Sequence, residues 1–271
     1  GRQRRDRNIP RNALLLPQES PWQKMFRSGD DGACITVTGF DFKSFHSVLE
    51  LFAPKFEAFT PWTGKQDGLT YKRVTPLKAK GRGRRRMVTA ISCLGLVLAW
   101  YRFWGGEFIL QGWFGFTGTQ ANVWLRFGRR MLIKCLVHNE DARVAFPSDA
   151  KVLQYKAIVK ARHKSLPDVY CTADGLKLHF QACRWLDEQS MFYNGWLRGH
   201  LVTNLFVFGA CGRIIAAVTN VPGSVHDSTL AIWGSVYKKF EACYERNQGV
   251  ACVDSAFAAN NNPYLIRSAQ H

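Results

Sequence analysis

Two aspartates at the ends of apolar runs place the strongest limit on what this chain can fold into. Val-Tyr-Cys-Thr-Ala leads into Asp174, Gly-Val-Ala-Cys-Val leads into Asp254, and each run is typical of a buried strand. Because an unpaired carboxylate is costly to bury, an acid in such a place needs a hydrogen-bond partner, a cation or a metal. The pair therefore predicts a shared divalent-ion site with Asp174 and Asp254 as its ligands.

Each of these acids also fits a structural role when it is taken alone. Asp174 opens an Asp-Gly pair, an ordinary turn signal, and Asp254 could cap a following helix. Asp227 differs from both, because it follows His226 at a helix start and suits an N-cap. For His226 and Asp227 a structural role is favoured, and a role behind the metal ligands or at a DNA end is the alternative.

The stretch around the two aspartates predicts the order strand, strand, strand, helix, strand. A Gly-bounded turn at residues 209–212 joins the second and third strands into an antiparallel hairpin. One amphipathic helix is expected from Asp227 to about Asn247, where Gly249 suits a left-handed C-cap. The four strands are expected at residues 169–173, 201–208, 213–219 and 250–253.

Four ordered motifs in this region resemble the DDE superfamily endonucleases of PIF/Harbinger-type transposons. They lie at residues 172–175, 192–196, 220–228 and 253–257, and the resemblance covers roughly residues 168–270. It implies a ribonuclease H-like mixed α/β sheet, in which the first and fourth strands lie side by side. Asp174 matches the first catalytic acid of the family and Asp254 the second.

The resemblance also implies a chemistry and one departure from it. Phosphodiester hydrolysis in this family needs clustered carboxylates that hold Mg²⁺ or Mn²⁺. The third acid of the family lies on a later helix, whereas residues 255–271 contain no Asp or Glu. The expectation is a C-terminally truncated DDE domain that is inactive as residues 1–271 and active only in a longer chain with a further acid.

The charge of the chain favours a polyanionic partner. Lys and Arg number 37 against 20 acids, which gives a net charge of +17, and 46% of the residues are hydrophobic. DNA is the predicted partner and an anionic membrane surface its rival. No small-molecule cofactor is indicated, and a homo-oligomer or a separate DNA-binding partner protein is compatible with the sequence. Eight cysteines without a Cys-x-x-Cys pair indicate reduced core thiols of an intracellular protein. The predicted location is the nucleus.

The N-terminal half is expected to be helical and basic. In residues 31–60, Asp41 can cap a helix that Pro54 would stop, and the apolar run from Met87 to Tyr101 falls short of a membrane span, which favours a buried helix. The predicted domains are a basic arm (1–30), a helical segment (31–60), a basic linker (61–86), a helix-turn-helix-like region (87–165) and the incomplete endonuclease (168–271).

Several basic side chains are candidates for nucleic-acid contact. A short helix over residues 109–114, a tight turn and a second helix capped at Thr117 or Thr119 resemble a helix-turn-helix, although an ordinary bundle helix fits as well. The basic linker could neutralise DNA phosphates, or it could be a solvated spacer. The motif Tyr193-Asn194-Gly-Trp196 could stack on bases, or its aromatic side chains could anchor an exposed loop. The candidates are Arg84, Arg85 and Arg86 in the linker, Arg126, Arg129, Arg130 and Lys134 on the second helix, and Arg198.

Three functional classes follow. The first is a transposase-derived, metal-dependent DNA endonuclease, which is a hydrolase. The alternative is a non-catalytic, domesticated DNA-binding protein that lacks the third acid. An unrelated metal-dependent phosphohydrolase is the third class, and it has little need of the basic segments.

Overall fold

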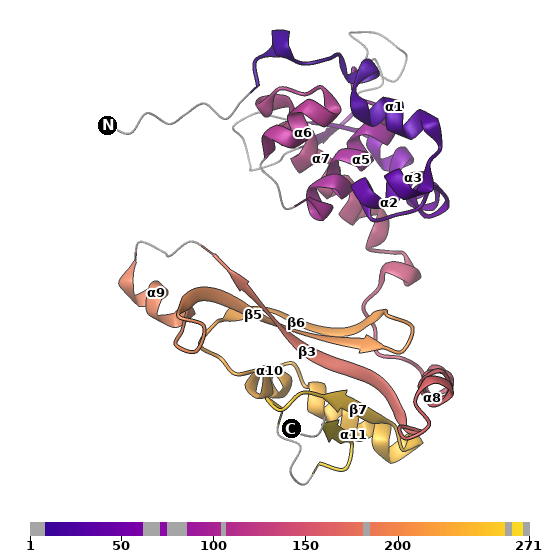
Figure 1. The fold of residues 1–271 in the computed structure, drawn as a ribbon, viewed down its shortest axis with the longest axis vertical. Helices are drawn as coiled ribbons and strands as arrows, with labels where there is room; N and C mark the ends of the chain where they lie inside the picture. The colour runs from indigo at the N-terminus through magenta and orange to yellow at the C-terminus, as the bar shows by residue number, and fades with distance from the viewer. Residues whose placement is uncertain are drawn as a thin grey trace. The chain divides into compact units, whose positions relative to one another are not determined.

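A computed structural model of the chain describes residues 9–61, 71–74, 86–103, 107–180, 185–257 and 262–267. It divides into two compact units, Gly1–Arg143 and Val144–His271 (Figure 1). The first unit is helical and the second is a mixed α/β sheet structure. Helix α8 (Asp149–Arg162) belongs to the second unit, although the predicted helix-turn-helix-like region, residues 87–165, includes it.

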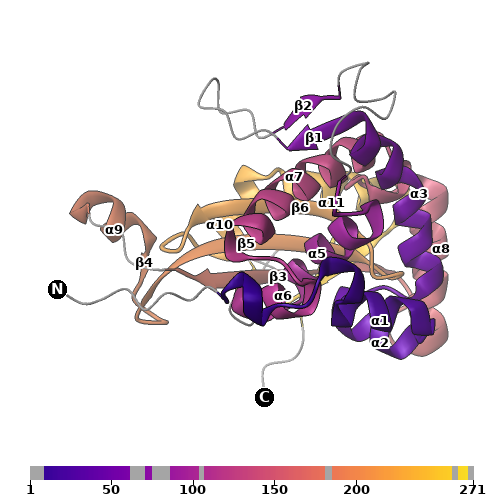
Figure 2. The ribbon, with the colours of Figure 1, turned by 90° about the horizontal axis from the view of Figure 1, so that it is seen from above.

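The first unit is built around one apolar helix, α5. Every residue from Ser92 to Ala99 in this helix is buried, which confirms the buried-helix prediction. No helix among the described residues is both long and apolar enough to span a bilayer. The helices are α1 (Pro21–Ser28), α2 (Asp31–Thr38), α3 (Phe42–Ala58), α5 (Ala90–Arg102), α6 (Glu107–Phe114) and α7 (Gly118–Leu136), with short 3-10 turns η1 (Arg11–Ala13), η2 (Pro17–Glu19) and η3 (Glu140–Ala142). A two-stranded ribbon, β1 (Phe59–Pro61) and β2 (Tyr71–Arg73), follows α3 (Figure 2).

Two expectations for this unit are wrong. Residues 9–30, which are expected to belong to a basic N-terminal arm, are part of the helical unit, because Ser20 caps α1 and Trp22 is fully buried in the core. Pro54 does not stop α3, which begins after its predicted cap Asp41 and runs on to Ala58. Residues 1–8 of the arm and most of the basic linker, 62–70 and 75–85, lie outside the described residues.

Close packing between α1 and α5 depends on Gly95. A Cβ atom at this position would overlap the indole ring of Trp22, which lies directly against the glycine. Gly95→Ala is therefore expected to cost about 1–3 kcal/mol of unfolding free energy through overpacking. Gly112→Ala in α6 is the matched control, because its Cβ would have room and the exchange should stabilise by about 0.5–1 kcal/mol. Urea unfolding followed by tryptophan fluorescence distinguishes them, and equal effects would contradict this packing.

The second unit is a curved sheet with helices packed against it (Figure 1). The strand order is β4-β5-β3-β7-β8, and β6 also pairs with β5. The pairing of β3 with β7 is parallel, which confirms that the first and fourth expected strands are neighbours. The elements are α8 (Asp149–Arg162), β3 (Val169–His179), α9 (Leu186–Phe192), β4 (Tyr193–Asn194), β5 (Gly199–Gly209), β6 (Ile214–Pro222), α10 (Asp227–Trp233), α11 (Val236–Asn247), β7 (Val250–Val253) and β8 (Leu265–Arg267).

The single amphipathic helix expected after the hairpin is instead two helices, α10 and α11. The break lies at Gly234 and Ser235. Gly234 approaches Val218 so closely that a Cβ there would overlap it, and Ser235 adopts a left-handed conformation with φ 53°. The C-cap prediction is also wrong by one residue, since Gln248 rather than Gly249 takes the left-handed position, with φ 52°. Non-glycine residues in this conformation are uncommon, which is why the sequence does not indicate them.

The two faces of the sheet have different surroundings. Cys171 and Ala173 of β3 face the core with Val207 and Leu205 of β5, together with side chains of α10 and α11. The alternate residues of β3, Thr172 and those after it at 174, 176 and 178, are exposed. Since side chains alternate along a strand, the sheet has one covered face and one open face.

Candidate metal and nucleic-acid site

Asp174 and Asp254 come to neighbouring strands on the open face of the sheet. Ala173 of β3 pairs in parallel with Val253 of β7, and each aspartate is the next residue of its chain. Parallel neighbours at the same level lie about 5 Å apart across a sheet. Both acids are exposed, so the sheet brings together two residues that the sequence separates widely.

Each carboxylate also has a local backbone contact. Oδ1 of Asp174 accepts a hydrogen bond from Gly175 N at 2.8 Å, and Oδ1 of Asp254 accepts one from Ala256 N at 2.9 Å. The Asp-Gly turn is not formed, because both residues lie inside β3. Asp254 supports a turn over residues 254–257 rather than a helix cap. Each of these hydrogen bonds involves only Oδ1, so they orient the two carboxylates and leave Oδ2 of each aspartate outside these two bonds.

Asp227 lies on the covered face, directly behind Asp174. It is only 6% exposed, and among the described residues its Oδ1 atom has no hydrogen-bond partner. Its carboxylate occupies the space that a side chain at Gly175 would fill, since a Cβ there would lie 2.7 Å from Cγ of Asp227. The N-cap of α10 is His226, without a side-chain capping bond, so the prediction that Asp227 caps this helix is wrong.

The protonation of Asp227 reflects this position. Burial raises the pKa of its carboxyl group above the usual range, and the negative charges of Asp254 and Asp174 raise it further. The nearby cationic groups Lys177 and His226 oppose this shift. Asp227 therefore interacts electrostatically with Asp174 and Asp254. The sequence does not indicate this interaction, because α10 is remote from β3 along the chain.

Asp227→Asn is expected to stabilise the second unit more at neutral pH than near pH 4. An acid whose pKa is higher in the folded protein than in the unfolded chain binds its proton more tightly when folded. The protein therefore loses stability as the pH rises from the unfolded pKa of about 3.9 through the higher pKa of the folded state. The Asn amide is uncharged at both pH values, so the variant does not lose stability in this way as the pH rises. Thermal unfolding in EDTA at both pH values is the measurement, and a gain of equal size at both would contradict the raised pKa.

The site fits a divalent cation held mainly by two protein carboxylates. Mg²⁺ keeps several waters and is commonly bound by one or two carboxylates together with substrate phosphates. In the part of the chain that is described, no group of three or more His, Cys, Asp and Glu side chains is close enough to hold a metal ion. Asp174 and Asp254 are the two carboxylates that could hold such an ion, and the unpartnered oxygen of Asp227 lies on the covered face beside Gly175.

The basic residues of α7 fall into two sets. Thr117 caps this helix through a capping box with Gln120, which confirms the first of the two predicted caps. Arg126 and Arg130 are exposed. The guanidinium of Arg129 instead lies 4.6 Å from the Trp100 ring centroid, and the Lys134 ammonium is 5.3 Å from that of Phe59. These aromatic contacts hold Arg129 and Lys134 against the helical unit.

Arg86 is engaged in the fold. Its guanidinium donates hydrogen bonds to the carbonyl oxygens of Phe56 and Phe59 at 2.6 and 2.5 Å, at the end of α3, and burial lowers its pKa. Two of its donors are therefore used within the fold, while its neighbours Arg84 and Arg85 lie outside the described residues. Arg198 is exposed in the turn between β4 and β5, at φ 49°.

Asn194 fixes that turn. Its Nδ2 donates to the carbonyl of Gly223 at 2.7 Å, and its Oδ1 accepts from Leu197 N at 3.0 Å. Trp196 is 90% exposed in the same turn. Asn194 therefore anchors the loop, which is one of the two roles expected for this motif. Trp196 is exposed and available for contact with a partner.

Comparison with known proteins bears on the second unit. Residues 173–270 match a family model described as DDE superfamily endonuclease. The chain matches no curated protein. It likewise matches no solved structure. The matched segment contains Asp174, Asp227 and Asp254, and this part of the chain is thus similar to the DDE superfamily endonucleases.

Proposed function

We propose that the chain is a transposase-type, metal-dependent DNA endonuclease with a ribonuclease H-like catalytic unit of the PIF/Harbinger type. The observation that carries the proposal is the family match over residues 173–270, together with the placement of Asp174 and Asp254 on adjacent strands. Acids with a pKa shifted by burial, such as Asp227 beside the pair, are common at functional sites. We infer that the reaction is hydrolysis of a phosphodiester bond of DNA, in the nucleus.

The two aspartates would hold Mg²⁺ or Mn²⁺ on the open face of the sheet. A divalent ion there would polarise the phosphate and favour ionisation of a water. Asp174 and Asp254 would orient the ion through the carboxylate oxygens that their backbone contacts position. Asp227 would help to hold β3 in place at Gly175, where no side chain intervenes.

Binding to the DNA backbone would come from exposed cations. The net charge of +17 supports a polyanionic partner, and Arg126 and Arg130 on α7 and Arg198 in the second unit are exposed. For duplex DNA, the logarithm of the binding constant falls linearly with the logarithm of the salt concentration. The slope is about −0.9 for each phosphate that the protein neutralises. Binding to long duplex DNA should therefore weaken steeply as salt is raised.

Nicking of supercoiled plasmid tests the proposal. We expect residues 1–271 to bind DNA in a salt-sensitive way, measured by filter retention, and not to nick plasmid. We expect nicking with Mn²⁺, and none in EDTA, from a longer protein that adds a third acid to these residues. Absence of nicking by that longer protein, with such binding intact, would instead support the alternative, a domesticated DNA-binding protein. Binding that does not change with salt would contradict both and point to an unrelated phosphohydrolase.

A further inference from the structure

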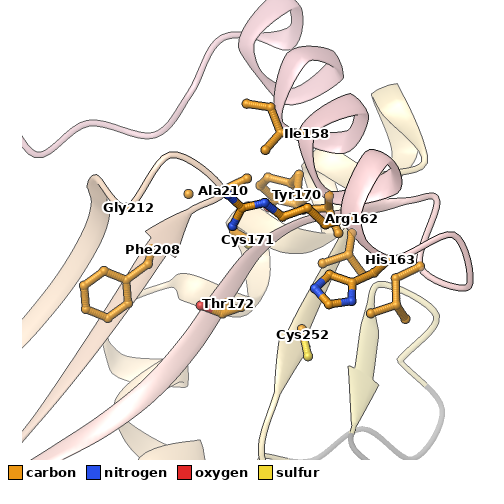
Figure 3. Close-up of a pocket in the computed structure, with 14 residues that line it drawn as sticks. Ile158, Arg162, His163, Tyr170, Cys171, Thr172, Phe208, Ala210, Gly212 and Cys252 are labelled. Atoms are coloured by element: carbon orange, nitrogen blue, oxygen red, sulfur yellow. The ribbon is translucent and has the colours of Figure 1, made fainter.

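A pocket of about 490 Å³ opens on the second unit beside the two aspartates. Its walls are the last turns of α8, the start of β3, and the end of β5 with the turn that follows (Figure 3). Figure 3 shows Arg162 and His163 extending from the end of α8 toward the sheet, with Thr172, Phe208 and Cys252 on the strands below. Its volume is within the range of small-ligand sites.

The strand register places this pocket next to the acid pair. Thr172 of β3 lies between Phe208 of β5 and Cys252 of β7, because it pairs with both. Two residues further along β3, Asp174 pairs with Phe206 of β5. Two residues along a strand span about 6–7 Å and keep to one face of the sheet. On the open face, the pocket residues Phe208, Thr172 and Cys252 therefore form a row across three strands. The next row along β3 contains Asp174.

The chemistry of the pocket suits a nucleotide. Phe208 and Phe206 have ring centroids 6.2 Å apart and form a short aromatic surface beside Asp174. Aromatic side chains next to a charged groove are the usual platform for single-stranded bases. Arg162 and His163 are exposed at the end of α8, and no Asp or Glu is among the described residues that line the pocket.

We propose that this pocket holds one nucleotide of the DNA strand whose neighbouring phosphate lies at Asp174 and Asp254. The base stacks on Phe208, and the guanidinium of Arg162 pairs with a phosphate of the same nucleotide. The assignment rests on the proposed nuclease function and makes it more specific. It requires an unpaired strand at the site, because a base inside a duplex cannot reach a pocket wall.

Photocrosslinking in EDTA tests the assignment without relying on cleavage. The probe is a single-stranded oligonucleotide containing 5-iododeoxyuridine, which couples to nearby aromatic rings on irradiation. Peptide mapping by mass spectrometry is expected to find the crosslink at Phe208 or at His163. Crosslinks found only elsewhere in the chain would overturn the proposal.

Matched variants separate the pocket from general charge effects. Phe208→Leu keeps an apolar side chain but removes the ring, and we expect about 10-fold weaker binding of the probe. Phe180→Leu removes an exposed ring at the far end of β3 and should leave binding unchanged. Arg162→Gln should weaken binding more than Lys160→Gln, which removes the same charge from an exposed position outside the pocket lining.

The outcomes distinguish this proposal from the proposed function. A crosslink at Phe208 in a protein that does not nick plasmid even with Asp174 intact and a third acid supplied would support the pocket and reject the nuclease. Nicking that depends on Asp174 but is insensitive to Phe208→Leu and Arg162→Gln would support the nuclease and reject the pocket. Circular dichroism and thermal unfolding of each variant confirm that the second unit is folded.

Discussion

In a protein that adds a third acid to residues 1–271, Asp174→Asn is expected to lower Mn²⁺-dependent plasmid nicking by at least about 100-fold, since even groups that only orient metal ligands change activity by 10- to 100-fold. The exchange keeps the size of the side chain and its contact with Gly175 N, through the amide oxygen. It removes one of the two charges that would hold the cation. DNA binding should not weaken, because a negative charge is lost beside a polyanion.

Asp254→Asn should behave in the same way as Asp174→Asn. Asp187→Asn is the matched control, because this aspartate is exposed on α9 of the same unit and the charge change is identical. Initial nicking rates of the three variants provide the comparison. Full nicking by Asp174→Asn, or equal loss in all three variants, would refute the role assigned to the pair.

Trp22→Ala is expected to destabilise the helical unit by about 3–5 kcal/mol, the usual cost of deleting a buried large aromatic side chain. Trp22 has no exposed surface, and its ring stacks 5.2 Å from that of Phe114 and lies against Gly95 of α5. Since domains are stable by only about 5–15 kcal/mol, this loss should bring the unit close to unfolding. Urea unfolding monitored by circular dichroism measures it.

Trp196→Ala serves as the control for this change. The same side chain is deleted from a 90% exposed position in the second unit, so the effect on unfolding should stay within about 0.5 kcal/mol. Comparable losses in the two variants would mean that α1 is not part of the core. A small loss in Trp22→Ala alone would lead to the same conclusion.

The sequence predicted those elements whose signals are local. Asp41 and Thr117 cap α3 and α7 as expected, and the apolar run before Arg102 forms a buried helix. The hairpin of β5 and β6 has the expected turn between Gly209 and Gly212. Each of these features depends on residues within a few positions of one another, so the pattern along the chain is sufficient to indicate them.

Features that depend on tertiary contacts were missed or wrong. Trp22 enters the core because Gly95 leaves space for it, and the two helices α10 and α11 separate where Gly234 approaches Val218. Asp227 reads as a cap in sequence, but the sheet places it behind Asp174 with an unpartnered oxygen. Likewise, the rings of Phe206 and Phe208 become part of a site only through their register with β3.

Mn²⁺ binding followed by electron paramagnetic resonance tests the central claim most directly, because the signal of the free ion falls as the protein binds it. The account predicts saturable binding by the protein, lost in Asp174→Asn and in Asp254→Asn and retained in Asp187→Asn. Binding that survives in both of the first two variants would show that the neighbouring strands β3 and β7 do not carry the metal site.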